Sequence, residues 1–128
     1  MSHSVNIKTA FMCMNNLASQ FTKLGWKIIK DSRCRTYPSD PRRDEVHQYV
    51  AQNPEQKGYD VGINVDQEGR AYFVCDFFDR SIERQLGKNL QHIKQGYALT
   101  QLKKELQYDD LNYKVVTLPT GELQVTAE

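Results

Sequence analysis

The sequence predicts an α+β domain: a mostly antiparallel sheet of five to six strands with two main helices on one face, in the order β-α-β-β-β-α-β-β. Three observations predict this class. Residues 59–66 alternate apolar with polar side chains, and a run rich in aromatic and β-branched residues follows at 70–78. Apolar residues recur at helical spacing before and after this pair. The 128 residues fit a single domain spanning 1–128.

The first thirty residues predict a strand, a helix and a second strand. Residues 5–11 alternate apolar and polar side chains, which is typical of a strand. Asn15 or Asn16 can cap the following helix, because a short side-chain oxygen accepts a hydrogen bond from a first-turn amide. Gly25 suits the C-terminal end of that helix, and residues 26–30 form the second predicted strand.

Residues 31–57 lack a regular pattern and are interrupted by Pro38, Pro41 and Pro54. Only residues 45–51 can form a short helix in this stretch. We therefore expect a long irregular loop, and loops of this length in compact domains are often functional or mobile.

The hairpin at residues 58–79 fixes the fold class. Its turn contains Gly69, which can adopt a backbone angle closed to other residues. Its second strand, residues 70–78, is apolar on both faces, which indicates a strand that is covered on both sides.

A long helical region follows the hairpin, and Asp79 or Ser81 can cap it. Its apolar stripe moves to another side near Gly96, so the helix bends there or is buried on two sides. Residues 113–118 and 122–126 predict a closing hairpin. The first stripe consists of Ile82, Leu86, Leu90, Ile93 and Tyr97, and the second of Leu99, Leu102 and Leu106.

Composition limits the classes of partner. The net charge is +1, so a strongly basic or acidic partner surface is not implied globally. Cys13, Cys34 and Cys75 are odd in number and widely spaced, which favours a reducing compartment. No apolar run approaches the ~20 residues of a membrane span, and no secretory signal is recognisable. We expect a cytoplasmic protein, or a stromal one if it is organellar, without a membrane partner.

The sheet face opposite the helices is more apolar than a fully solvated face should be. The long loop or a second copy of the chain should therefore cover it. We predict that a protein partner binds there, and a homodimer is plausible. The candidate partner-binding residues are Ile29, Tyr72, Val74, Val116 and Leu118.

Several short motifs occur in order along nearly the whole chain. They are Met1-Ser2-His3-Ser4, Ile7-Lys8-Thr9, Leu24-Gly25-Trp26, Gly58-Tyr59-Asp60-Val61-Gly62, Asp76, Tyr97-Ala98 and Lys104-Glu105-Leu106. Together they resemble a plastid and cyanobacterial family known as hypothetical chloroplast reading frame thirty-five, a domain of unknown function. The resemblance implies a photosynthetic lineage and a plastid or cytoplasmic setting, and it implies no activity and no catalytic residue. The chain departs from the family pattern at Val5-Asn6, between residues 33 and 56 and around 81–88, which suits a divergent bacterial or phage member.

A basic loop supplies an alternative function. Residues 30–43 carry Lys30 and four arginines against Asp31 and Asp40. Basic residues interleaved with an aromatic residue can hold a phosphate backbone and stack a base, so the alternative is weak single-stranded nucleic-acid binding. The opposing interpretation is a solvated loop whose arginines pair with nearby acids. The candidate nucleic-acid residues are Arg33, Arg35, Tyr37, Arg42 and Arg43.

The sequence contains no complete catalytic, metal or cofactor motif. Its histidines and cysteines are scattered, with no two at ligand spacing. Cys75 has no base beside it, and the neighbouring Asp76 raises rather than lowers the pKa of a thiol. Tyr72 and Phe73 point to opposite faces, which disagrees with the stacking strand of an RNA-recognition fold. We therefore predict no catalytic residue, no metal and no cofactor. The predicted function is a non-enzymatic protein-interaction or self-associating module.

Overall fold

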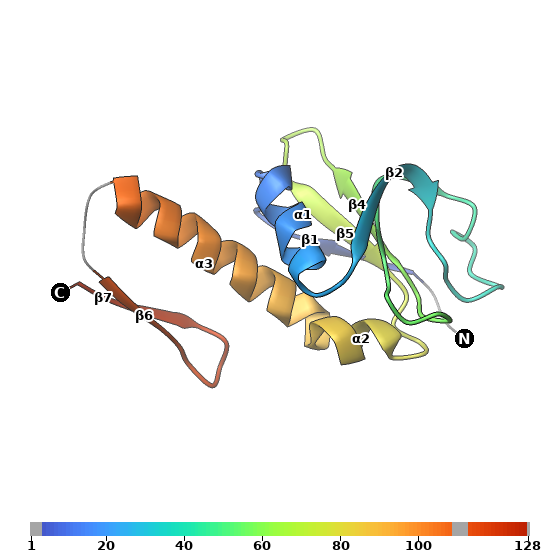
Figure 1. Cartoon of the computed structure of the whole chain (residues 1–128). Coiled ribbons are helices and arrows are strands. Elements are labelled where there is room, and N and C mark those ends of the chain that lie inside the picture. The colour runs from blue at the N-terminus through green and yellow to red at the C-terminus, as the bar shows by residue number, and fades with distance from the viewer. Residues whose placement is uncertain (1–3, 109–112, 128) are drawn as a thin grey trace.

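The computed structural model describes residues 4–108 and 113–127, and it has the α+β class that the sequence predicts (Figure 1). Five strands form an antiparallel sheet in the order β1-β5-β4-β3-β2, and a separate two-stranded sheet contains β6 and β7. The elements are β1 (Val5–Lys8), α1 (Met14–Lys23), β2 (Lys27–Arg33), β3 (Val46–Gln52), β4 (Val61–Val65), β5 (Ala71–Cys75), α2 (Ser81–Leu86), the 3₁₀ turn η1 (Lys88–Leu90), α3 (Gln91–Tyr108), β6 (Tyr113–Thr117) and β7 (Leu123–Ala127).

Strands β2 to β5 form an antiparallel meander, and the first strand, β1, pairs with the last strand of that meander, β5. α1 connects the two edge strands, β1 and β2, and the chain then passes through β3, β4 and β5 as antiparallel neighbours. β5 ends beside β1, where Ile7 pairs with Phe73 and Lys8 pairs with Tyr72. Because side chains alternate along a strand, Ile7 and Phe73 lie on the helix-covered face, and Lys8 and Tyr72 lie on the opposite face. We call that opposite face the second face.

The core lies between the sheet and the helices. The Phe21 ring of α1 contacts the rings of Trp26 and Phe73 edge-on, at centroid distances of 5.9 and 6.0 Å. The first predicted helical stripe is confirmed, because all five of its residues are buried in the same cluster. Both main helices, α1 and α3, therefore cover the same face of the sheet.

The helical region is interrupted at residues 87–90. This break precedes Gly96, where the predicted apolar stripe moves to another side of the helix. Gly87, Asn89 and Leu90 have φ angles of 80°, 55° and 58°. An α-helix of L-residues does not accommodate these angles, so α2 ends before the break and α3 begins after it. Gly96 lies inside the continuous helix α3.

Gly96 instead allows α1 to approach α3 closely. A Cβ atom at Gly96 would collide with the amide of Gln20, which donates hydrogen bonds to Asn16 (2.8 Å) and Thr100 (3.0 Å). Asn16 in turn donates to the Tyr97 carbonyl at 3.2 Å. Asn16 therefore connects two helices and does not cap α1, whose N-cap position is Cys13.

Residues 46–52 form strand β3, and the short helix predicted at 45–51 is wrong. β2 and β4 supply backbone hydrogen-bond partners on the two sides of this segment. Val46, Tyr49 and Val50 are β-branched or aromatic, and such residues suit a pleated sheet. Pairing with strands that are distant in sequence outweighs the weak helical spacing of this segment.

The predicted closing hairpin forms, but it does not join the five-stranded sheet. The predicted partner-binding face included Val116 and Leu118 and therefore required the hairpin to be part of that sheet. β6 and β7 pair with each other and lie alongside α3, away from that sheet (Figure 1). The hairpin turn contacts α3 where Gln95 Nε2 donates to the carbonyl of Gly121 at 3.3 Å. The main sheet keeps five strands because β3, which the sequence pattern did not predict, takes a place in it.

Gly62 of β4 leaves room on the second face for the buried ring of His47. A Cβ atom at Gly62 would lie 2.7 Å from His47 Cγ. We expect Gly62→Ala to lower the free energy of unfolding by about 1–3 kcal/mol, because the ring must move. In a His47→Ala background, the same substitution should lower the free energy of unfolding by less, as measured by urea denaturation. Equal costs in the two backgrounds would contradict this packing.

Candidate functional site

The loop of residues 34–45 connects the edge strand β2 to β3, and its contacts with residues near β1 and β5 place it against the second face. It leaves the edge strand β2 and reaches the opposite edge strand β1, where Arg42 Nη1 donates to Asn6 Oδ1 at 2.6 Å. Between these points, Thr36 Oγ1 lies 3.3 Å from Asp76 Oδ2, just after β5. Val74, which pairs with Asn6 and lies on the second face, is only 3% exposed. The loop thus covers part of the apolar second face.

Arg35 and Asp60 connect this loop to the sheet. The Asp60 carboxylate is buried and accepts hydrogen bonds from the Arg35 backbone amide (2.7 Å), the Arg35 guanidinium (2.8 Å) and the Asn53 backbone amide (2.9 Å). The Asp60 amide donates to the Arg35 carbonyl at 2.9 Å. The guanidinium also donates to the carbonyls of Asn53 and Gln56, each at 2.7 Å. One ion pair therefore joins the 34–45 loop, the end of β3 and the start of β4.

Asp40 is a second buried carboxylate of the loop. Its oxygens accept hydrogen bonds from the Ser4 hydroxyl, the Thr36 hydroxyl (3.2 Å) and the Arg42 backbone amide (2.8 Å). Burial raises the pKa of the Asp40 carboxyl, but the hydrogen bonds from Ser4, Arg42 and Thr36 outweigh burial and bring it below its ordinary value. The charged carboxylate thereby ties the loop to the residue that precedes β1.

His47 lies beneath the end of the loop and is 2% exposed. Its Nδ1 lies 2.9 Å from Nδ2 of Asn64, and the Asn64 Oδ1 accepts from the Gln48 backbone amide at 2.9 Å. Because the Asn64 amide nitrogen is the donor, His47 Nδ1 is the acceptor and the ring is neutral. Burial lowers the pKa of His47, while Glu45 raises it and Arg42 lowers it further.

The predicted nucleic-acid residues do not form one free cationic surface. Arg35 pairs with Asp60, the Arg42 guanidinium donates to Glu45 at 2.9 Å, and Arg43 lies 3.7 Å from Asp44. Among the described residues only Arg33 of the four arginines has no ion pair, which agrees with the interpretation of a loop whose arginines pair with nearby acids.

Tyr37 has an aromatic neighbour that the sequence analysis missed. Its ring meets that of Phe78 edge-on at a centroid distance of 5.2 Å, and Phe78 is 59% exposed. Phe78 is the last residue of the run 70–78, which the sequence pattern predicts to be one packed strand. The strand ends at Cys75, so Phe78 belongs to the loop that follows it.

The five predicted partner-binding residues lie in three different places. Ile29 and Tyr72 are half-buried in the sheet, Val74 is buried under the loop, and Val116 and Leu118 belong to the separate hairpin. The structure therefore does not bring them together, because the hairpin lies alongside α3. Two of these places remain exposed: the surroundings of Tyr72 and the hairpin.

Tyr72 lines an open hollow of about 420 Å³ on the second face. The hollow lies between β1 and the turn that joins β4 to β5. Its other lining residues are all polar: Asn6, Lys8, Asp66, Gln67, Glu68 and Arg70. This side of the second face is not covered by the 34–45 loop and is open to a ligand.

The C-terminal part of the chain forms an arm, which we define as residues 98–106 of α3 together with the hairpin β6–β7. Figure 1 shows the arm extending away from the five-stranded sheet. None of residues 98–106 is buried, although Leu99, Leu102 and Leu106 are half-buried. Val116 of β6 is 42% exposed. The arm contains apolar side chains outside the core.

Cys34 and Cys75 do not supply a reactive thiol to these places. Burial raises the pKa of Cys34 to about 12, with smaller contributions from Asp60, Glu45 and Asp40. Burial also raises the pKa of Cys75 well above its ordinary value. Both thiols are therefore protonated at neutral pH, and a protonated thiol is a poor nucleophile. Over residues 4–108 and 113–127, no group of three His, Cys, Asp or Glu side chains is placed to hold a metal ion.

In the part of the chain that the structure describes, no helix is both long and apolar enough to cross a membrane. No protein-family model, no curated protein and no solved structure matches the chain. The functional argument therefore depends on the chain's own surfaces.

The Arg35–Asp60 pair should matter far more for stability than an exposed pair. We expect Asp60→Ala to lower the free energy of unfolding by about 2–3 kcal/mol, because it leaves the guanidinium and two backbone amides without their acceptor. Glu68→Ala is the matched control, since it removes the exposed Arg70–Glu68 pair, and it should cost about 0.5 kcal/mol or less. Urea denaturation measures both. Similar costs for the two variants would contradict the structural role of Asp60.

The buried neutral His47 should make stability depend on pH. Its pKa in the folded chain lies below the ordinary value of 6.5, so the unfolded chain binds more protons in the range between the two values. The free energy of unfolding should therefore fall as the pH is lowered from 7 through 6.5 toward about 5, above the range in which carboxylates titrate. Urea denaturation across this range measures the slope, which should disappear in His47→Asn and persist in His92→Asn. A slope that persists in His47→Asn would show that another group causes it.

Proposed function

We propose that this chain is a non-enzymatic protein-interaction module that forms a homodimer through its C-terminal arm. The observation that carries the proposal is the arm itself, because its apolar side chains lie outside the core. Leu99, Leu102 and Leu106 are spaced by three and four residues, which places them along one side of α3. A stripe of this kind on a soluble helix normally faces another apolar surface.

The hairpin also supports a partner. β6 and β7 form a two-stranded sheet whose turn contacts α3, and a two-stranded sheet is only marginally stable in water without a third strand or close packing on a helix. Within the described strands, β6 and β7 pair only with each other, so each has an outer edge that can accept another strand. A partner that packs on the helix stripe and the hairpin would stabilise both.

A second copy of the chain suits this surface. The net charge of +1 produces little repulsion between copies. In a two-fold dimer the same patch meets itself, so an apolar stripe meets an apolar stripe and a strand edge meets a strand edge. Val116 and Leu118, two of the partner-binding residues predicted from the sequence, lie in this patch.

The setting of this module is part of the proposal. The ordered motifs that resemble hypothetical chloroplast reading frame thirty-five support an origin in the plastid and cyanobacterial lineage, and the departures from the family pattern suit a divergent bacterial or phage member. They also support a location in the cytoplasm or the plastid stroma.

Weak single-stranded nucleic-acid binding is the second candidate function. The edge-on pair of Tyr37 and the exposed Phe78 favours it, because exposed aromatic rings can stack bases. It ranks second because Arg35, Arg42 and Arg43, three of the four arginines proposed as phosphate contacts, pair with acidic residues of the chain itself.

Light scattering after gel filtration tests the dimer. The chain should show twice its own mass at high concentration and dissociate on dilution. Leu102→Glu should weaken association by at least about tenfold, because it places a charge in the centre of the apolar interface. Leu24→Glu is the matched control, since Leu24 is an exposed leucine (40%) at the end of α1, and it should leave association unchanged.

Two outcomes would contradict the proposal. The first is a monomer at every concentration measured. The second is a dimer that Leu102→Glu and Leu24→Glu affect equally, because the interface would then lie elsewhere.

A further inference from the structure

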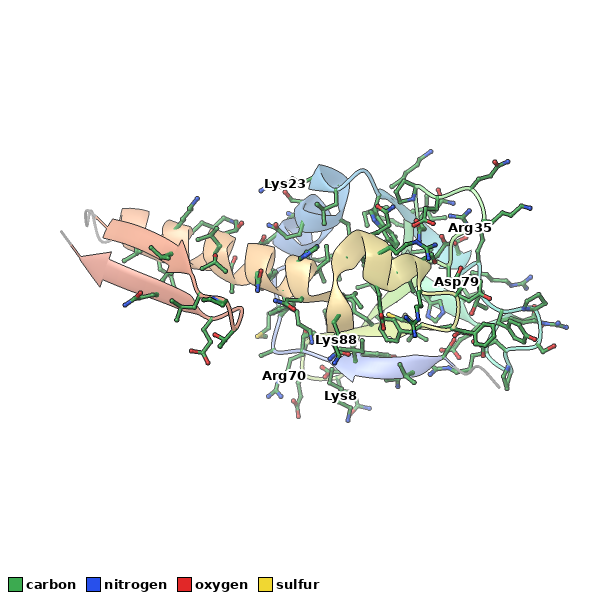
Figure 2. All side chains as sticks on the ribbon, turned by 90° about the horizontal axis from the view of Figure 1, so that it is seen from below. Lys8, Lys23, Arg35, Arg70, Asp79 and Lys88 are labelled. Atoms are coloured by element: carbon green, nitrogen blue, oxygen red, sulfur yellow. The ribbon has the colours of Figure 1, made fainter. Side chains whose placement is uncertain are left out.

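The hollow at Tyr72 is built from strands in register. Lys8 of β1 pairs with Tyr72 of β5, and Tyr72 pairs with Asn64 of β4. Asn6 lies two residues before Lys8 and therefore points to the same face. Figure 2 shows Lys8 and Arg70 projecting from the same edge of the molecule, while Lys23 lies on the opposite side. The sheet thus places an aromatic ring and two cationic side chains around one open space.

The turn on one side of the hollow is fixed before any ligand arrives. The Asp66 amide donates to the Arg70 carbonyl at 2.9 Å, and Asp66 Oδ1 accepts from the backbone amides of Glu68 and Arg70, each at 2.9 Å. Gly69 has a φ of 82°, which allows the tight turn. Because this backbone is already ordered, ligand binding does not pay for ordering it.

The charges around the hollow leave one cation without a partner. Arg70 pairs with Glu68 at 3.0 Å, and both side chains are more than half exposed, so this pair is weak. The Asp66 carboxylate accepts its hydrogen bonds from the backbone amides of the turn. No ion pair involves Lys8 among the described residues. An anionic ligand can therefore bind Lys8 directly and compete with Glu68 for Arg70.

The neutral groups add a second element of recognition. Arg42 donates to Asn6 Oδ1, which orients the Asn6 amide. The Tyr72 ring is half-buried and can stack on a flat ring. The volume of about 420 Å³ lies in the range of small-molecule sites, which runs from roughly 300 to 1,000 Å³.

We propose that this hollow binds a small flat-ring molecule that carries a phosphate or carboxylate group. The ring stacks on Tyr72, and the anionic group forms charge-assisted hydrogen bonds with Lys8 and Arg70. Asn6 and Gln67 can hydrogen-bond to polar groups on the ring. This site lies on the sheet, outside the arm, so the proposed ligand binding does not depend on whether the chain dimerises.

Backbone amide chemical shifts of the full chain test the site, with AMP and benzoate as flat anionic probes and with inorganic phosphate and adenosine as partial ones. AMP or benzoate should shift the amides of residues 6–8 and 66–72, and the stronger of the two identifies the preferred anionic group. Lys8→Gln should weaken that binding roughly tenfold, the loss expected for one charge-assisted hydrogen bond. Tyr72→Thr should weaken it as well.

Lys23→Gln is the matched control, because Lys23 is an exposed lysine of α1 on the opposite side of the molecule (Figure 2), and it should leave binding unchanged. Equal shifts from inorganic phosphate and AMP would overturn the role of Tyr72. Absence of shifts with both flat anions would overturn the site, as would binding that Lys8→Gln leaves unchanged. The thermal melting of each variant shows that it is folded.

Discussion

The ion pair between Arg35 and Asp60 is the interaction on which the rest of the structure depends. Asp60 lies immediately before β4, and Arg35 lies just after β2, so the pair joins segments that the chain separates by twenty-five residues. Burial of a carboxylate costs free energy unless hydrogen-bond donors compensate for the lost water, and Arg35 and Asn53 supply donors to Asp60. This need holds the 34–45 loop across the second face of the sheet.

The covered second face decides which surfaces are left for function. Val74 and His47 lie beneath the loop and are removed from any partner. Arg35 and Arg42 hold the loop in place, so they are not free to form a nucleic-acid surface. The side of the sheet around Tyr72 and the arm beyond Tyr97 are not covered by the loop, and the dimer and the ligand site are proposed at these two places.

Much of the fold is visible in the sequence because it depends on local periodicity. The hairpin at 58–79 and the buried stripe from Ile82 to Tyr97 follow directly from alternation and helical spacing. β3 was missed because pairing with β2 and β4 stabilises it, and no local pattern records that pairing. The Tyr72 hollow and the split of the partner-binding residues depend on which strands become neighbours, and this order is likewise a tertiary property.

Hydrogen exchange at the backbone amides of Arg35, Asn53 and Asp60 tests the central claim most directly. Each of these amides donates a hydrogen bond within the Arg35–Asp60 network. If this network holds the loop to the sheet, all three amides should exchange as slowly as the amides of β4 and β5. Exchange at the rate of an open loop, with β4 and β5 still protected, would show that the loop does not stay on the second face and would contradict the account.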